Sequence, residues 1–337
     1  MKIGIVGFGF MGRAHLEQYQ TIPGARVVAV AARHLKSLAD SSGAYSNIEG
    51  VGQGRLDTSG VRLAADWREL LAMKDVDVVD VCSPTPTHLE IVTAALKAGK
   101  HVLCEKPVGR TLKETQQIAV AGAKAKGLFM PAMVMRFWPE WVWLKQVIEK
   151  GRYGRVLSAS FQRLSPLPPK TRWTRDGKAS GGALLDLHIH DTDFIYWLFG
   201  MPRAIFSRGY SFVSGEADHV VTQYVYDKVP LVTAEGGWTL DDGMKFAMRY
   251  RVKFERATAE FDLSRKPTLL VAHKGRVEQP RGVMEGDAYR AELAYFLECV
   301  RQSAKPEGMM AQDSVRVMRI IAAEQESVGR GAVVKCR

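Results

Sequence analysis

The fold of this chain is decided by the stretch Lys2-Ile-Gly-Ile-Val-Gly-Phe-Gly-Phe-Met-Gly-Arg-Ala-His-Leu16. Residues 3–6 predict a short buried strand, and glycines follow at once in G-x-G-x-x-G spacing, the dinucleotide fingerprint when a helix comes next. Gly7 allows the tight turn, Gly9 leaves no side chain between backbone and pyrophosphate, and Gly12 lets the helix lie close to the strand. The predicted cofactor contacts here are Gly7, Phe8, Gly9, Phe10, Met11 and Gly12. Glycine triplets also occur in ordinary loops, so the rest of the chain must support this assignment.

Length and composition indicate a globular protein of two domains. The chain has 337 residues, of which 46% are hydrophobic and 25% charged. No apolar run reaches the roughly 18 residues that cross a bilayer, so we expect no membrane association. Because the first strand begins at residue 2, we expect no signal peptide and a cytoplasmic protein.

The cysteines and the net charge exclude other classes. Four cysteines show no C-x-x-C or zinc-ligand spacing, which predicts reduced thiols and no metal site. The net charge of +11 raises the question of nucleic acid, but lysines and arginines are scattered among acids, with no run of five. We expect no nucleic-acid binding, and some of this charge would suit a phosphorylated cofactor.

A second buried strand at residues 26–32 ends where an Asp or Glu would bind the ribose 2′-hydroxyl of NAD. Ala32 stands there, followed by Arg33 and His34. Without a carboxylate to repel it, a 2′-phosphate can lie against the Arg33 guanidinium. The sequence therefore favours NADP over NAD, with Arg33 and His34 as cofactor contacts; if Arg33 is instead a solvated surface residue, the site takes either cofactor.

Strand-like and helix-like segments alternate over residues 1–134, which predicts a doubly wound parallel sheet, a Rossmann domain. Further strands are expected at 61–64, 76–82, 101–104 and 128–134, and helices at 67–73, 88–98 and 111–126. Ligands bind beyond the carboxyl ends of such strands, where residues 83–88 and 105–107 follow two of them. The further predicted cofactor contacts are Ser83, Pro84, Thr85, His88, Glu105 and Lys106. Lys106 is also a candidate catalytic residue, although on residues alone a surface lysine is an equal alternative.

Residues 135–337 differ in kind and predict a second, α+β domain for substrate binding and oligomerisation. Period-two or β-branched runs indicate an open, mostly antiparallel sheet. Its strands are expected at 156–163, 204–212, 219–226, 231–238, 244–254 and 258–263, with helices at 138–150, 289–302 and 313–325.

Residues 180–199 predict a helix with Asp186 and His190 four residues apart on one face. A carboxylate that orients an imidazole and stabilises its charged form suits a general acid or base. A structural hydrogen bond is the common alternative for an isolated Asp–His pair, and we expect His188 to be structural. Zinc on Asp186, His190 and Asp193 is not favoured, because hydride transfer from an alcohol needs no metal once a base is present.

Three separated motifs, Gly7–Gly12, Glu105-Lys106-Pro107 and Gly182–Asp193 with its D-x-x-x-H, together resemble the glucose-fructose oxidoreductase / inositol dehydrogenase / rhizopine catabolism (Gfo/Idh/MocA) family over essentially the whole chain. The resemblance implies an NAD(P)-binding Rossmann domain and an open-sheet domain that covers a carbohydrate substrate and forms a homodimer or homotetramer. It also implies that Lys106, Asp186 and His190 are the catalytic trio.

The expected activity is NAD(P)-dependent hydride transfer between nicotinamide and a secondary alcohol or ketone of a sugar, glycoside or polyol. His190 would be the base and Lys106 would polarise the oxygen, or Lys106 would itself be the base. Family branches leave two alternatives: a redox-neutral glycoside hydrolase acting by transient C3 oxidation, and a non-catalytic NADP-binding sensor. The expected substrate contacts are Asp186, His190, Arg163, Arg172 and Trp173, with Lys170 and Arg175 nearby; these cations suit an anionic sugar, or are solvated surface charge.

Overall fold

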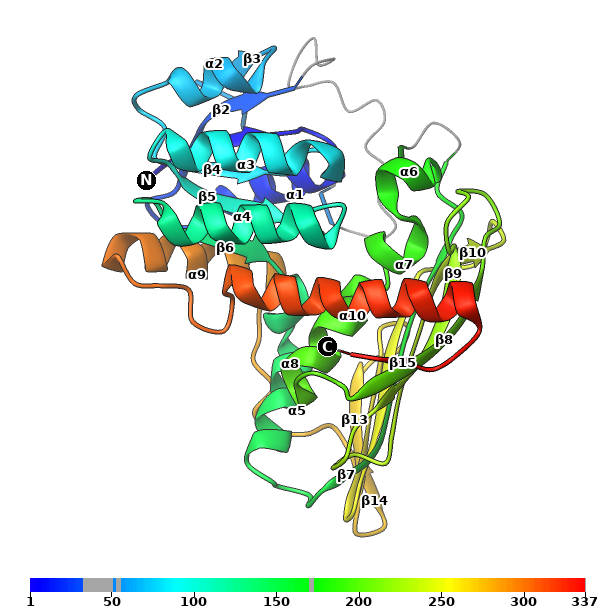
Figure 1. Ribbon diagram of the computed structural model, residues 1–337. Helices are drawn as coiled ribbons and strands as arrows, with labels where there is room; N and C mark the ends of the chain where they lie inside the picture. The colour runs from blue at the N-terminus through cyan, green and yellow to red at the C-terminus, as the bar shows by residue number, and fades with distance from the viewer. Residues whose placement is uncertain (33–50, 53–55, 170–172, 337) are drawn as a thin grey trace. The chain divides into compact units, whose positions relative to one another are not determined.

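The computed structural model describes residues 1–32, 51–52, 56–169 and 173–336 (Figure 1). The chain divides into two compact units. Unit 1 comprises residues 1–134 and 286–315, and unit 2 comprises residues 135–285 and 316–337. Residues 286–315, predicted as part of the second domain, thus group with unit 1. Their helix α9 (Ala288–Gln302) packs on α1 (Phe10–Tyr19), burying Leu293 and Phe296.

Unit 1 contains a six-stranded sheet in which every neighbouring pair is parallel. The strands are β1 (Lys2–Val6), β2 (Arg26–Ala31), β3 (Arg62–Ala64), β4 (Val78–Val81), β5 (His101–Glu105) and β6 (Phe129–Ala132). Their order, β3-β2-β1-β4-β5-β6, confirms the doubly wound prediction. The order reverses at β1 and β4, which places a ligand crevice beyond the carboxyl ends of these two strands.

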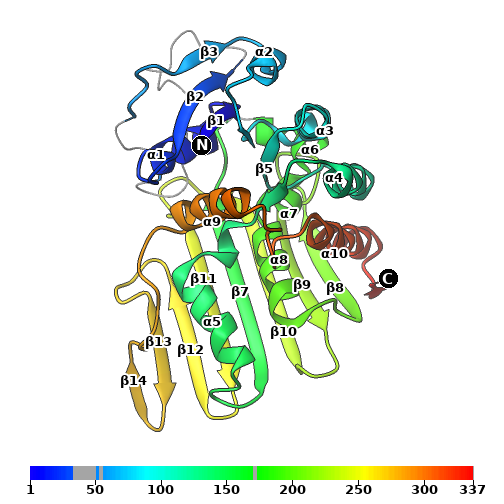
Figure 2. The ribbon, with the colours of Figure 1, turned by 90° about the vertical axis from the view of Figure 1, so that its left-hand side faces the viewer.

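The helices of unit 1 lie against this sheet. Besides α1 and α9 they are α2 (Trp67–Ala72), α3 (His88–Lys97) and α4 (Leu112–Lys124), with a 3-10 turn at Thr85–Thr87. Figure 2 shows α1 on one side of the sheet and α3 and α4 on the other. Side chains cap three of the helices: Asp66 at α2, Thr111 at α4 and Asp287 at α9 each accept a backbone N–H of the first turn.

Unit 2 contains a nine-stranded sheet in the order β14-β13-β12-β11-β7-β10-β9-β8-β15. Its strands are β7 (Val156–Pro166), β8 (Ala204–Tyr210), β9 (His219–Val225), β10 (Leu231–Leu240), β11 (Ala247–Phe254), β12 (Ala257–Asp262), β13 (Leu269–His273), β14 (Arg276–Glu278) and β15 (Val334–Lys335). β7 and β10 are parallel and the other pairs antiparallel, which confirms a mostly antiparallel sheet.

One face of this sheet is covered by helices. They are α5 (Pro139–Glu149), α8 (Ile189–Phe199) and α10 (Ala311–Arg330), while the short α6 (Gly177–Ser180) and α7 (Gly182–Asp186) lie near one end of the strands (Figures 1 and 2). The core beneath them is aromatic: the ring of Trp141 on α5 lies 4.6 Å from that of Phe194 and 5.3 Å from that of Tyr250. On the other face the sheet is open, and β11 alternates buried and exposed residues along its length.

Candidate active site

The glycine loop joins β1 to α1 in unit 1. Gly7 has φ +91°, a conformation that favours glycine. A Cβ on Gly12 would lie 2.1 Å from the Gly7 carbonyl oxygen, so the start of the helix and the turn meet backbone to backbone. A Cβ on Gly9 would meet no atom within 4 Å, and Gly9 is an exposed N-cap that provides no side-chain cap.

The first N–H groups of α1 are therefore available to an anion at an open surface. This geometry fits a dinucleotide pyrophosphate, with Gly9 as the point of closest approach. Phe8, Phe10 and Met11 are half-buried around it. Arg33 and His34, the predicted contacts to the 2′-phosphate, lie outside the described residues.

The turn after β4 is cross-linked to the turn after β5. The His88 side chain is buried, with Nδ1 2.9 Å from the carbonyl oxygen of Pro107 and Nε2 2.8 Å from that of Ser83. Burial, the largest effect, lowers the pKa of His88, while the two carbonyl oxygens that its ring nitrogens face oppose this shift. The Ser83 and Thr87 hydroxyl oxygens are 2.7 Å apart, while Pro84 is half-buried and Thr85 buried. His88 therefore ties together the two turns predicted to border the cofactor.

Lys106 follows Glu105 at the end of β5. The Lys106 N–H donates to Glu105 Oε2 at 3.1 Å, and the Lys106 side chain is half-buried. Glu105 Oε1 lies 3.3 Å from Nε2 of His15, whose Nδ1 lies 2.8 Å from Asp80 Oδ2. The sequence analysis did not identify His15 and Asp80. The available signal was a polar residue at each of two positions expected to be buried: His15 in the helix after the glycine loop and Asp80 in a buried strand.

The predicted single helix over residues 180–199 is wrong. Asp186 ends α7, His190 is the second residue of α8, and both are half-buried. At the break the N–H of His188 donates to Ala183 O at 2.8 Å, one residue beyond the α-helical spacing. Asp186 and His190 therefore flank a helix junction instead of lying one turn apart on a continuous helix.

The break coincides with a buried network around His188. Its Nε2 lies 3.3 Å from Glu324 Oε1 on α10 and 3.2 Å from the Tyr224 hydroxyl on β9. Tyr224 donates to the same Glu324 oxygen at 2.6 Å, and all three side chains are essentially inaccessible. His188 is structural, as expected, and its buried contacts fix the junction between the two short segments.

Two buried Arg–Asp pairs hold the start of α8. Arg163 on β7 donates from Nε to Asp191 Oδ2 at 2.8 Å, and its Nη1 contacts the Met248 sulfur at 3.0 Å. Arg136 donates from Nε to Asp193 Oδ2 at 2.9 Å. Arg163 is only 3% exposed, so the structure places this predicted substrate residue in a structural pair; a substrate contact by Arg163 stays a prediction.

The remaining predicted substrate residues lie in the link after β7. Trp173 begins a 3-10 turn (Trp173–Arg175) and is half-buried, and Arg175 donates to the carbonyl oxygen of Pro168 at 2.6 Å. Lys170 and Arg172 lie outside the described residues.

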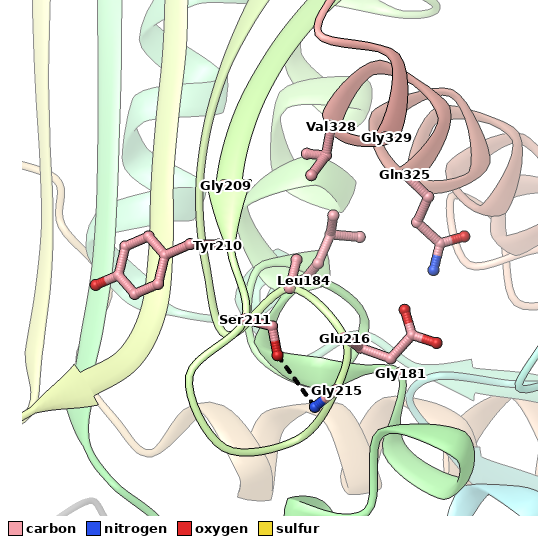
Figure 3. Close-up of a pocket in the computed structure, with 11 residues that line it drawn as sticks. Gly181, Leu184, Gly209, Tyr210, Ser211, Gly215, Glu216, Gln325, Val328 and Gly329 are labelled. Carbon is pink, nitrogen blue, oxygen red and sulfur yellow. Dashed lines mark hydrogen bonds between the residues drawn. The ribbon is translucent and has the colours of Figure 1, made fainter.

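Unit 2 also has a cavity of about 280 Å³ between α7, the β8–β9 connection and α10 (Figure 3). Leu184, Glu216 and Gln325 line it, together with several glycines. Neither Asp186 nor His190 is among its lining residues, so this cavity is separate from the predicted catalytic residues of the same unit.

Potential metal ligands come together in unit 1. Among the described residues, His15, Asp80 and Cys82 place one possible ligand atom each within 4.8 Å of one another. Burial raises the pKa of the Cys82 thiol. The 2.8 Å separation of His15 and Asp80 is that of a hydrogen bond, which accounts for their proximity.

Comparison with known proteins follows the same division of the chain. Residues 1–133 match the model of the GFO/IDH/MocA oxidoreductase family, NAD-binding Rossmann fold, and residues 141–260 match the GFO/IDH/MocA C-terminal domain. The chain belongs to this family. The resemblance seen in the three motifs is thereby confirmed, and the protein is an NAD(P)-dependent oxidoreductase.

Named relatives include dehydrogenases of cyclic alcohols. Uncharacterized oxidoreductase YrbE of Bacillus subtilis is 26% identical over 98% of this chain and 95% of its own length. Levoglucosan dehydrogenase of Pseudarthrobacter phenanthrenivorans is 32% identical over 61% of this chain and 53% of its length, and myo-inositol 2-dehydrogenase of Thermotoga maritima is 31% identical over 59% and 55%. The chain is thus matched over only about half the length of these two.

Solved structures share the fold. Levoglucosan dehydrogenase in complex with NADH and L-sorbose superposes with a TM-score of 0.85 at 22% identity, over 100% of this chain and 99% of that one.

Among the described residues, no helix is both long enough and apolar enough to cross a membrane.

Proposed function

We propose that the protein is a dehydrogenase or reductase acting on a secondary alcohol or ketone of a sugar, glycoside or polyol. The observation that carries the proposal is the open, side-chain-free α1 N-terminus at Gly9 in a chain of this oxidoreductase family. The names of the relatives support the substrate class, since levoglucosan and myo-inositol both present ring hydroxyls.

The proposed roles follow from the side-chain chemistry. The nicotinamide, when bound, supplies the hydride acceptor or donor. His190 takes the hydroxyl proton, Asp186 orients the imidazole and stabilises its charged form, and the Lys106 ammonium stabilises negative charge developing on the oxygen. The alternative assignment makes Lys106 the base.

The test replaces Lys106 and His190 separately by alanine. Each variant is expected to bind NADH with the affinity of the unmodified protein and to lose at least about 100-fold in kcat, the lower range of general acid–base catalysis. Lys113→Ala is the control, because Lys113 is an exposed residue of α4. Retention of full turnover by both active-site variants would refute the proposed roles.

A product assay separates this function from the family's other activities. Sugars, polyols and glycosides are supplied with cofactor while absorbance at 340 nm and products are followed together. A sustained change in absorbance supports the dehydrogenase. Aglycone release without net absorbance change identifies the redox-neutral glycoside hydrolase, and cofactor binding without product identifies a sensor.

We further propose that NADP is preferred, on the strength of Arg33 and the absence of a carboxylate at Ala32. Arg33→Asp is expected to lower kcat/KM for NADP at least about tenfold, as one charge-assisted phosphate contact is lost, while sparing NAD. If the ratio of kcat/KM for NADP to kcat/KM for NAD were unchanged in Arg33→Asp, the proposed role of Arg33 in this preference would be refuted.

The substrate is proposed to be anionic, because Arg172 and Trp173 combine a cation with an aromatic surface for a sugar ring. Pairs of neutral sugars and their uronates test this: kcat/KM is expected to favour the uronate, and Arg172→Ala to reduce that preference. Higher kcat/KM for the neutral sugars would contradict it.

We propose that a second copy of the chain covers the open face of the unit 2 sheet, giving a homodimer or homotetramer. That face carries exposed apolar side chains, Val221 on β9 and Leu231 on β10, and the exposed Arg251 of β11. Light scattering should give a mass of at least two chains, and Val221→Glu should lower this mass.

The cytoplasmic location stays a prediction, which cell fractionation tests.

A further inference from the structure

A buried charged cluster lies directly beneath the glycine loop in unit 1. His15, on the second turn of α1, has no accessible surface. Its Nδ1 is 2.8 Å from Asp80 Oδ2 on β4, and its Nε2 is 3.3 Å from Glu105 Oε1 at the end of β5. A single imidazole thus lies between two carboxylates that come from two neighbouring strands.

A carboxylate oxygen faces each ring nitrogen of His15, and this geometry favours an imidazole that is protonated on both nitrogens. Burial alone disfavours a charge on His15, but Asp80, chiefly, outweighs it, and the pKa of His15 lies well above its usual value. Burial raises the pKa values of the neighbouring Cys82, Tyr19 and Glu292, which favours their uncharged forms. The two carboxylates therefore favour the imidazolium form of His15.

Glu105 connects this cluster to Lys106. While Oε1 faces His15, Oε2 accepts the N–H of Lys106 at 3.1 Å. Glu105 is 8% exposed, so water does not compete strongly for either contact. The turn that bears Lys106 is therefore held to the helix that follows the glycine loop by Asp80, His15 and Glu105 in sequence.

We propose that His15 is a positioning residue, which as an imidazolium anchored by Asp80 holds Glu105 and thereby sets the backbone of Lys106 relative to the glycine loop. His15 contacts Asp80 by a hydrogen bond and Glu105 by a charged contact at 3.3 Å, and no covalent bond is made or broken. The proposal rests on the proposed function only for the catalytic role of Lys106. The same side chains with Cys82 could instead ligate a metal, which would require a neutral imidazole and a thiolate.

The first test needs no activity. In protein labelled with ¹⁵N-histidine, the His15 ring is expected to show two protonated nitrogens at pH 8, assigned by its loss in His15→Gln. A neutral ring at pH 8 would overturn the proposal. So would a stoichiometric metal ion in the purified protein that His15→Gln removes.

The second test measures what His15 acts through. His15→Gln is expected to bind NADH within about threefold of the unmodified affinity and to lose about 10- to 100-fold in kcat, as for the loss of one buried contact between charged groups. His101→Gln is the control, because the Nδ1 of His101, on the same strand as Glu105, accepts only the Leu128 N–H. This control should keep kcat.

A double-mutant cycle separates positioning from general destabilisation. In a Lys106→Ala background, with residual turnover followed over hours by product analysis, His15→Gln should cost nothing further. An equal loss of kcat in both backgrounds would show that His15 does not act through Lys106 and would overturn the proposal. If Lys106→Ala kept full turnover, the proposed catalytic role of Lys106 would fail, whereas the ¹⁵N spectra would still report the protonation state of His15.

Discussion

Asp191, the residue directly after His190, forms a buried ion pair with Arg163 of β7, with Nε and Oδ2 2.8 Å apart. The two side chains are 3% and 0% exposed. Asp191 also lies in the first turn of α8, where a carboxylate is favoured by the helix dipole. The pair therefore fixes the turn of helix that carries His190, although neither residue is one of the predicted catalytic residues.

Removing one partner of this pair should be costly. Arg163→Met leaves the Asp191 carboxylate buried without its cation, and we expect a loss of about 3–5 kcal/mol in unfolding free energy. Urea unfolding followed by tryptophan fluorescence measures it. The double variant Arg163→Met/Asp191→Asn should recover part of the loss, and additive losses would contradict a direct pairing.

Gly9 and Gly12 should respond differently to the same substitution. The methyl group of Gly9→Ala would meet no atom within 4 Å, so the free energy of unfolding should change by no more than about 0.5 kcal/mol. The same methyl group should weaken NADH binding at least about tenfold. Gly12→Ala forces the Gly7 carbonyl away and should lower both stability and affinity. Calorimetry and NADH fluorescence measure the two effects. Tight NADH binding by Gly9→Ala would contradict the assigned pyrophosphate site.

Gly236 on β10 makes room for His188. A Cβ there would lie 2.6 Å from His188 Nδ1, so Gly236→Ala should cost about 1–3 kcal/mol by overpacking and lower kcat by moving the α7–α8 junction. Gly329→Ala on α10 is the matched control, because nothing lies within 4 Å and alanine favours the helix by about 0.5–1 kcal/mol. Thermal unfolding compares them, and equal melting temperatures would refute the steric argument.

Glu292 on α9 should make the stability of unit 1 depend on pH. Burial, then the Glu105 and Asp80 carboxylates, raise its pKa well above 4.5, while His15 opposes this. A raised folded pKa stabilises the fold fully below the unfolded pKa, and this contribution is lost as pH rises through the folded value. The unfolding free energy of Glu292→Gln, relative to that of the unmodified protein, should therefore rise by up to about 1.4 kcal/mol for each pH unit above about 4.5. Melting temperatures from pH 5 to 8 test this; a difference that is independent of pH would contradict it.

Most of the fold was predictable because it follows local periodicity. The strand predicted at 156–163 is β7 (Val156–Pro166), and the helix predicted at 289–302 is α9 (Ala288–Gln302). The hairpin β13–β14 was missed, although Gly275 is a local signal for its turn. In the structure Lys274 and Gly275 both have positive φ, as a tight hairpin turn requires. β15 has two residues, too few for any pattern.

The candidate site was predictable only where its chemistry lies in short motifs. Its supporting contacts were not, because they join residues far apart in sequence: His188 with Glu324, and Arg163 with Asp191. The same contacts explain the missed helix break, since the apolar pattern of residues 180–199 continues through His188. A buried contact between a polar ring and a carboxylate far away in the sequence does not change the hydrophobic periodicity of either segment.

The grouping of α9 with α1 has a consequence for dissecting the protein. Neither unit is one continuous piece of chain. A gene truncated after codon 134 would therefore express a nucleotide-binding fragment whose α1 has lost its packing against α9. A soluble fragment, or a chimera with a relative, would have to transplant residues 1–134 and 286–315 together.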